Sequence, residues 1–146
     1  KDQMPRLSKF LFGSWLKTLK IPSIQNKNDE IYFSCGYKVF KGACHIRNIK
    51  VSECRLDVED KLCKFKKKAI LRWRLSTSGW EITTSDKTVE LNSNNFSIFI
   101  SSDATLKRAE MVKGWVSRHY LEKEEIQVLE IEVTEECIIN TRLVWN

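Results

Sequence analysis

A run of basic side chains in the middle of the sequence has the residue types and spacing to bind a polyanion. Between Lys61 and Leu75 the chain carries seven basic residues and no acidic one. If this segment is extended, alternate side chains lie on one face about 7 Å apart. Each phosphate neutralised by such a row would add a salt-dependent increment to affinity. The predicted cationic face consists of Lys64, Lys66, Lys68, Arg72 and Arg74.

An acidic segment offers a second interpretation of the same row. Residues 122–136 carry seven Glu and one Lys. If this segment forms a strand beside Lys64–Arg74, the two rows become cross-strand ion pairs, each contributing only about 0.2–1 kcal/mol. Charge runs more often form solvated or paired faces than ligand sites. We therefore favour the paired or solvated face and keep the ligand-binding face as the alternative.

The sequence contains no arrangement typical of catalysis. His45 and His119 are expected to be core-edge or surface histidines, because neither has enough candidate ligands around it for a metal. Asp29 together with residues 59–61 has the residue types of a metal-dependent nuclease. However, Glu59-Asp60 is expected to form a turn, where acidic residues need no catalytic role. We predict no catalytic residue, no metal ligand and no cofactor.

The number and spacing of the cysteines indicate the redox state of the cellular compartment. There are five, and none forms a C-x-x-C pair. We expect buried free thiols, rather than disulfides, in a reducing compartment. This favours an intracellular location, nuclear or cytoplasmic. The cysteines are Cys35, Cys44, Cys54, Cys63 and Cys137.

Composition predicts one globular domain over residues 1–146. The chain is 42% hydrophobic, carries a formal net charge of +6, and has only five Gly and two Pro. No segment approaches the ~20 apolar residues that a transmembrane helix needs. Because the sequence begins at Lys1, we expect a domain excised from a longer protein.

Two helices are predicted. Apolar residues at helical spacing over 8–20 indicate an amphipathic N-terminal helix, whose Phe10, Trp15 and Leu19 are candidate partner-docking residues. A longer helix is predicted over 103–121, with Ser102 or Asp103 as its cap.

The β-rich core is expected over 31–101, where the hydrophobic period is two, and two further strands over 126–145. The predicted strands are Ile31–Phe40, Ala43–Val51, Glu53–Val58, Leu62–Leu75, Trp80–Thr84, Thr88–Leu91, Phe96–Ile100, Ile126–Val133 and Cys137–Trp145. The predicted turns are Lys41-Gly42, Glu59-Asp60, Ser78-Gly79, Asp86-Lys87 and Asn92 to Asn95.

These elements predict an α+β fold with a mainly antiparallel, curved sheet, or a partly open barrel or sandwich, packed with helices. Many short strands followed by a helix with a central Trp resemble the pattern of pleckstrin-homology-like barrels. The resemblance is one of pattern alone.

The expected function is a non-catalytic binding or scaffolding module that mediates protein–protein interaction within a larger intracellular protein or complex. The alternative is a DNA- or RNA-backbone-binding domain that uses the basic strand face, and the third is a binder of acidic phospholipid. The expected partner is accordingly a protein, then DNA or RNA, then an acidic membrane lipid.

Overall fold

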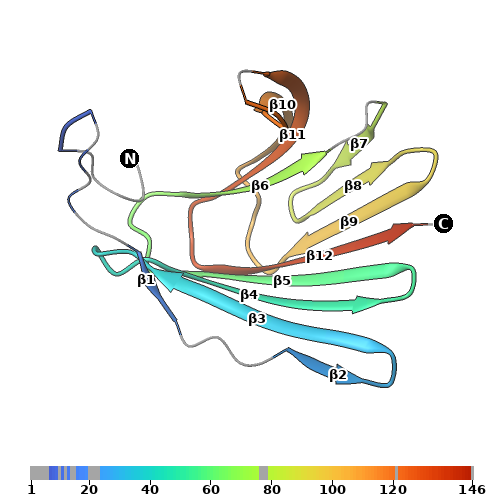
Figure 1. Ribbon diagram of the computed structural model, residues 1–146, viewed down its shortest axis with the longest axis horizontal. Helices are drawn as coiled ribbons and strands as arrows, with labels where there is room; N and C mark the ends of the chain where they lie inside the picture. Colours follow the sequence, from blue (N-terminus) through green and yellow to red (C-terminus); the bar gives the residue numbers. More distant parts are fainter. Residues whose placement is uncertain are drawn as a thin grey trace.

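The computed structural model describes residues 7–9, 11, 13, 16–19, 24–75, 79–120 and 122–145. In this part of the chain every regular element is a strand (Figure 1). The strands are β1 (Lys17–Thr18), β2 (Gln25–Lys27), β3 (Glu30–Lys38), β4 (Cys44–Ser52), β5 (Arg55–Cys63), β6 (Ala69–Leu75), β7 (Glu81–Thr84), β8 (Thr88–Asn92), β9 (Phe96–Ser102), β10 (Arg108–Val116), β11 (Glu124–Val133) and β12 (Cys137–Trp145).

The strands form two antiparallel sheets. The larger has nine strands in the order β1-β3-β4-β5-β12-β9-β8-β7, with β2 paired to β3, and the smaller has the order β10-β11-β6. Most neighbours along the chain pair as hairpins, but β12 inserts between β5 and β9. Figure 1 shows the small sheet lying over the large one. The fold is therefore an antiparallel β-sandwich.

The core lies between the two sheets. The small sheet contributes Leu71, Leu129 and Ile131, and the large sheet contributes Ile100 and Ile139 to the same buried cluster. Along β9, β11 and β12, buried residues largely alternate with more exposed ones, as expected for a sheet with one face on the core.

The period-two pattern correctly predicted most strands of the large sheet, including β12, and strand β11 of the small sheet. The expected turn at Lys41-Gly42 is confirmed, and Gly42 has a φ of 97°, which favours glycine. A second turn, absent from the sequence prediction, joins β2 to β3. Its residues Asn28 and Asp29 have φ values of 50° and 61°, which the short polar side chains of Asn and Asp tolerate.

The predicted helix over 103–121 is wrong, because none of the described residues of this segment is helical and its central part, Arg108–Val116, forms strand β10. Ala109 and Met111 pack against the core while Arg108 and Glu110 pair on the other face. Of the two expected cap residues, Ser102 makes a local hydrogen bond, since its Oγ accepts from the Ala104 amide at 3.2 Å. Asp103 Oδ1 instead accepts from the Ile138 amide on β12 at 2.8 Å. This turn leads into a strand rather than a helix, so the comparison with pleckstrin-homology-like barrels fails as well.

The predicted helix over 8–20 also fails where the structure describes it. Residues 17–18 form β1, which pairs with the end of β3. The amide of Leu19 donates to the Gly36 carbonyl at 2.9 Å, and its side chain packs over Gly36, where a Cβ would lie 3.0 Å away. The Leu19 side chain is therefore partly buried against β3. Phe10 and Trp15 lie outside the described residues.

The predicted continuous strand Leu62–Leu75 is split between the two sheets. Its first two residues end β5, residues 64–68 form a bend that starts with Lys64 at a φ of 57°, and β6 begins at Ala69. The predicted turn at Glu59-Asp60 is also wrong, because both residues lie within β5. In the bend only Lys67 breaks the alternation of apolar and polar residues, so the pattern gave little sign of the bend.

The expectation of free thiols is wrong for two cysteines. Cys44 and Cys63, on neighbouring strands β4 and β5, form a disulfide with a Cα–Cα distance of 5.2 Å. Among the remaining thiols, Cys54 is exposed and Cys137 is buried. Burial raises the pKa of the Cys137 thiol.

None of the described segments is a helix of the length and apolarity needed to span a membrane.

Candidate functional site

The structure does not bring the five predicted anion-binding residues into one row. Arg72 and Arg74 lie on β6 in the small sheet, whereas Lys64, Lys66 and Lys68 lie in the bend before it. The strand geometry on which the row depended is therefore absent.

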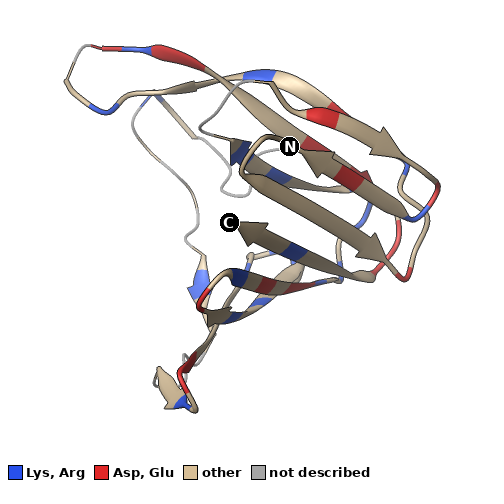
Figure 2. Cartoon of the chain, turned by 90° about the vertical axis from the view of Figure 1, so that its right-hand side faces the viewer, with Lys and Arg blue, Asp and Glu red and all other residues tan. Residues whose placement is uncertain are grey.

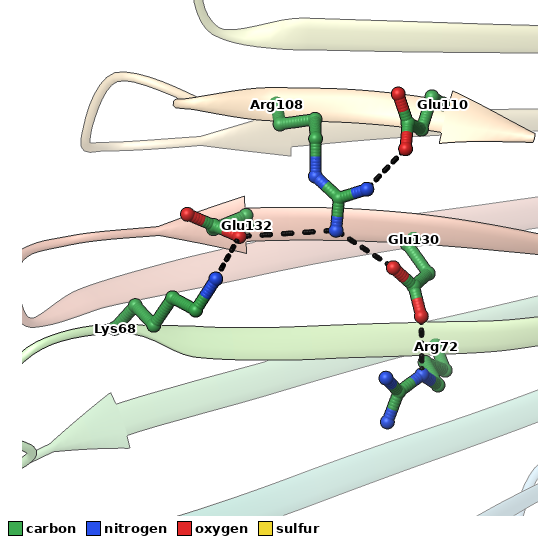
Figure 3. A network of polar contacts seen from close by, with 6 residues as sticks. All are labelled: Lys68, Arg72, Arg108, Glu110, Glu130 and Glu132. Carbon is green, nitrogen blue, oxygen red and sulfur yellow. Dashed lines mark hydrogen bonds and ion pairs between the residues drawn. The ribbon is translucent and has the colours of Figure 1, made fainter. Parts of the chain in front are cut away.

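The paired alternative is confirmed for part of the row. Strand β11 lies directly beside β6, with Glu130 opposite Arg72. Figure 3 shows the resulting network: Arg72 Nε is 2.7 Å from Glu130 Oε1, and Lys68 Nζ is 2.7 Å from Glu132 Oε2. From the far side, Arg108 on β10 contacts Glu130 at 2.7 Å.

This network is electrically balanced. Its three cations are Lys68, Arg72 and Arg108, and its three anions are Glu110, Glu130 and Glu132. The hydrogen bond from Arg72, helped by that from Arg108, lowers the pKa of Glu130 against the opposing effect of burial. Arg74, the next cation on β6, donates to the Trp115 carbonyl at 3.3 Å. The small sheet thus carries charges of both signs side by side (Figure 2) and offers no uniform polyanion-binding face in its described residues.

A buried carboxylate lies on the core side of the large sheet. Asp60 has no exposed surface. His45 Nε2 is 2.6 Å from its Oδ1, and Arg47 contacts both oxygens, at 2.6 and 2.9 Å. Burial alone would raise the pKa of Asp60, but the hydrogen bonds of His45 and Arg47 outweigh it and lower the pKa. Arg47 also stacks over Trp73 at 5.0 Å, so this cluster joins the two sheets.

The outer face of the large sheet contains a hollow of about 510 Å³. Two cross-strand rows line it, both set by strand register. The first row is Asn48, Glu59, Asn140 and Ser101, from β4, β5, β12 and β9. The second is Tyr32, Lys50, Asp57, Arg142 and Phe99, and it begins one strand earlier, on β3. Five adjacent strands span about 19 Å, which is the length of a short oligomer rather than of one small metabolite.

Hydrogen bonds between the side chains that line the hollow hold several of them in place. The Asn48 amide donates to Glu59 at 2.8 Å. Asp57 accepts from Arg55 at 2.6 Å and from Arg142 at 2.9 Å. Burial would raise the pKa of Asp57, but these two arginines lower it. The carboxylate therefore stays ionised and fixes the two guanidinium groups in place.

An exposed aromatic ring and an unengaged amide complete the hollow. Phe99 is 43% exposed, and the structure shows no hydrogen bond from the Asn140 side chain to any described residue. The hollow therefore offers an apolar ring face beside amide, guanidinium and carboxylate groups. Such a surface suits a ligand with both hydroxyl groups and apolar ring faces.

The sequence analysis did not single out these residues, although it predicted the strand Cys137–Trp145 that carries two of them. In this strand Asn140 and Arg142 lie on the face opposite the core-facing Ile139 and Thr141. The pairing of β12 with both β5 and β9 is what brings them beside Asp57 and Phe99, and no local motif encodes it.

Comparison with known proteins shows the fold. No family model and no curated protein matches this chain. Among solved structures, the chain is similar to the heparan sulfate lyase HepC of Pedobacter heparinus, with a TM-score of 0.68 and 13% identity over 89% of this chain and 22% of that one. It is also similar to a heparinase III gene product, with a TM-score of 0.66 and 13% identity over 88% of this chain and 21% of that one.

The chain spans about a fifth of the length of these two proteins. At 13% identity the similarity establishes the β-sandwich fold alone.

Proposed function

We propose that this chain is a non-catalytic β-sandwich module of a larger polysaccharide-processing protein, and that it binds polysaccharide in the hollow on the outer face of its large sheet. The hollow is the single observation that carries the proposal. Its exposed Phe99 ring and its amide and charged groups are the chemistry with which proteins bind sugar rings and hydroxyls.

The fold supports the same proposal. One of the two similar proteins is by name a heparan sulfate lyase and the other a heparinase, and each is several times longer than this chain. A module of this kind would hold the polymer while another part of the protein performs the chemistry. The expected protein–protein role then becomes contact with the rest of the same protein.

The disulfide changes the expected compartment. Disulfides persist in oxidising compartments and are rare in the nucleus and cytoplasm. The Cys44–Cys63 bond therefore supports an extracytoplasmic location over the intracellular one that the cysteine spacing led us to expect.

Binding to soluble polysaccharides tests the proposal. Isothermal titration calorimetry with heparan sulfate and with a neutral glucan should give saturable binding to at least one polymer. The double variant Phe99→Ala/Asn140→Ala should lose about tenfold in affinity, since it removes the ring face and one amide. Its matched control is Tyr120→Ala/Asn94→Ala, because both residues are exposed and lie outside the hollow. Absence of binding to either polymer, or equal binding by the two double variants, would overturn the proposal.

A further inference from the structure

One end of the large sheet gathers lysines. By register, Lys17 on β1 lies opposite Lys38 on β3, and Lys38 lies opposite Cys44 on β4. Lys61 precedes Cys63 by two residues on β5, so it lies on the same outer face. We call this group, at the left of Figure 1, the lysine end. Its seven exposed members are Lys17, Lys38, Lys41, Lys61, Lys64, Lys66 and Lys67.

These lysines differ from the other cations of the same segment. In the part of the chain that the structure describes, none of the seven makes an ion pair, whereas Lys68 is paired with Glu132 and Arg72 with Glu130. On the side of β12, which begins opposite Leu62, the turn before the strand carries Glu135 and Glu136. Asp103 lies beside Ile138 on β12, and Glu59 is the next outward residue from Lys61 on β5. Seven cations are thus set against four anions, so the end keeps a net positive charge.

The lysine end is held by a covalent bond. The Cys44–Cys63 disulfide joins β4 and β5 between Lys38 and Lys64. Directly after it, Lys64 takes a left-handed backbone conformation that turns the chain toward the small sheet. Clustered like charges repel one another and favour unfolding, and the disulfide opposes this by restricting the unfolded chain.

The lysine end adjoins the hollow. Lys61 lies one cross-strand row from Glu59, which lines the hollow, about 7 Å along β5. The immediate neighbours of Lys61 in its own row are Ile46 on β4 and Ile138 on β12. Asp103 lies beyond Ile138 and accepts a hydrogen bond from its amide at 2.8 Å. A polymer lying in the hollow would reach the lysines past Glu59, whose carboxylate accepts a hydrogen bond from Asn48.

We propose that the lysine end is an anion-binding subsite for the sulfate or carboxylate groups of an acidic polysaccharide whose neighbouring sugars occupy the hollow. This inference rests on the proposed function. In this proposal the sulfate or carboxylate groups bind at the lysine end, and the sugar rings bind in the hollow. Lysine ammonium groups are point charges on flexible side chains. The subsite would therefore select polymers by their density of negative charge and not by the geometry of one particular sugar.

Polysaccharide is favoured over nucleic acid by the aromatic residues. Single-stranded nucleic acid is bound by several rings on which successive bases stack. Phe40, 80% exposed, is the large exposed aromatic residue that the described chain presents at this end. The adjoining hollow has amides and a single well-exposed ring, Phe99, which suits sugars better than a series of bases.

A matched pair of triple variants tests the subsite. Lys38→Gln/Lys61→Gln/Lys64→Gln removes three charges from the lysine end. Lys27→Gln/Lys107→Gln/Lys123→Gln removes three exposed charges elsewhere, so the two proteins have the same net charge. At ~50 mM salt the first variant should bind heparan sulfate about tenfold more weakly than wild type and show a shallower dependence of affinity on salt, whereas the second should bind like wild type.

Comparing heparan sulfate with an uncharged form of the same polymer distinguishes failure of the subsite from failure of the proposed function. Desulfated, carboxyl-reduced heparan sulfate should bind the wild type and the first triple variant equally, through the hollow. If the wild type binds heparan sulfate and the two triple variants bind it equally, the subsite is refuted while the proposed function stands. If the wild type binds neither polymer, the proposed function fails as well. Tighter binding of a single-stranded oligonucleotide of equal charge would refute the polysaccharide assignment.

Discussion

Replacing Asp60 with asparagine removes one charge from the core and leaves the size of the side chain almost unchanged. Asp60 is fully buried and accepts three hydrogen bonds, two of them from Arg47 and one from His45. Asparagine retains one acceptor oxygen and presents an amide group to the other donor. The substitution therefore loses a charge-assisted hydrogen bond, worth about 1.5–3 kcal/mol, and leaves Arg47 without its counter-ion.

The expected cost follows from how well Arg47 is sheltered. Removing one partner of a buried ion pair typically costs about 3–5 kcal/mol. The Arg47 side chain is 26% exposed and stacks on Trp73, so it keeps some hydration and a second favourable contact. We therefore expect Asp60→Asn to lower the free energy of unfolding by about 3 kcal/mol, and the midpoint of thermal unfolding by about 10 °C.

The same residue predicts a dependence on pH. Because the folded state lowers the pKa of Asp60, its contribution to stability is fully present above the unfolded pKa of about 3.9. This contribution is lost as the pH falls through the lower folded value. Wild type should therefore lose stability steeply below about pH 4, and Asp60→Asn should show a shallower acid limb.

Thermal and urea unfolding at several pH values provide the assay, with Asp57→Asn as the control. Asp57 also accepts from two arginines, but its side chain is 25% exposed and those of Arg55 and Arg142 are 43% and 54% exposed. Solvent screening should limit the cost of Asp57→Asn to about 1 kcal/mol or less. Equal losses in the two variants would refute the argument that burial decides the energy of these clusters.

Two further predictions concern the backbone of the sandwich. Reduction of Cys44–Cys63, or Cys44→Ser/Cys63→Ser, should lower the free energy of unfolding by about 3 kcal/mol, because the bond closes a loop between residues 19 apart; equal denaturation midpoints with and without reductant would contradict this. Gly114→Ala should destabilise the chain by about 1–3 kcal/mol, since the added Cβ would lie 2.3 Å from Val128 Cγ2. Adding Val128→Ala should recover part of that loss in the same urea titration, and a double variant no more stable than the single one would show that the cause lies elsewhere.

The strands of the large sheet could be predicted because one face of the sheet meets a core. Val89, Leu91, Ile98 and Ile100 alternate with more exposed residues, and such a period of two is a local property of the sequence. The helix predicted over 103–121 failed because Leu106, Ala109 and Val112 are spaced as on a helix face. In the structure Ala109 and Val112 lie on β10 of the small sheet, and Leu106 lies in the connection that precedes β10. Gly114 and the β-branched valines beside it were the local signals that favoured a strand.

The bend over 64–68 could not be predicted, because its causes lie outside the segment. The disulfide partner of Cys63 is Cys44, and the residues that pair with β6 lie on β11, more than fifty residues further along the chain. Both contacts are decided by which strands become neighbours, and a period of two carries no information about neighbours.

The same reasoning explains why the basic residues of one segment have two different environments. Lys68 and Arg72 reach the small sheet, where β11 presents Glu130 and Glu132 at the facing positions, so their charges are neutralised by neighbouring side chains. Lys61 lies at the end of β5 in the large sheet, and Lys64 follows directly after this strand. The positions paired with this end of β5 and its neighbour β4 include lysine, cysteine and isoleucine residues. A charge run therefore predicts a binding surface only where strand order leaves its cations without ion pairs. Among the described residues this condition is met at the disulfide end of the large sheet and fails on the small sheet.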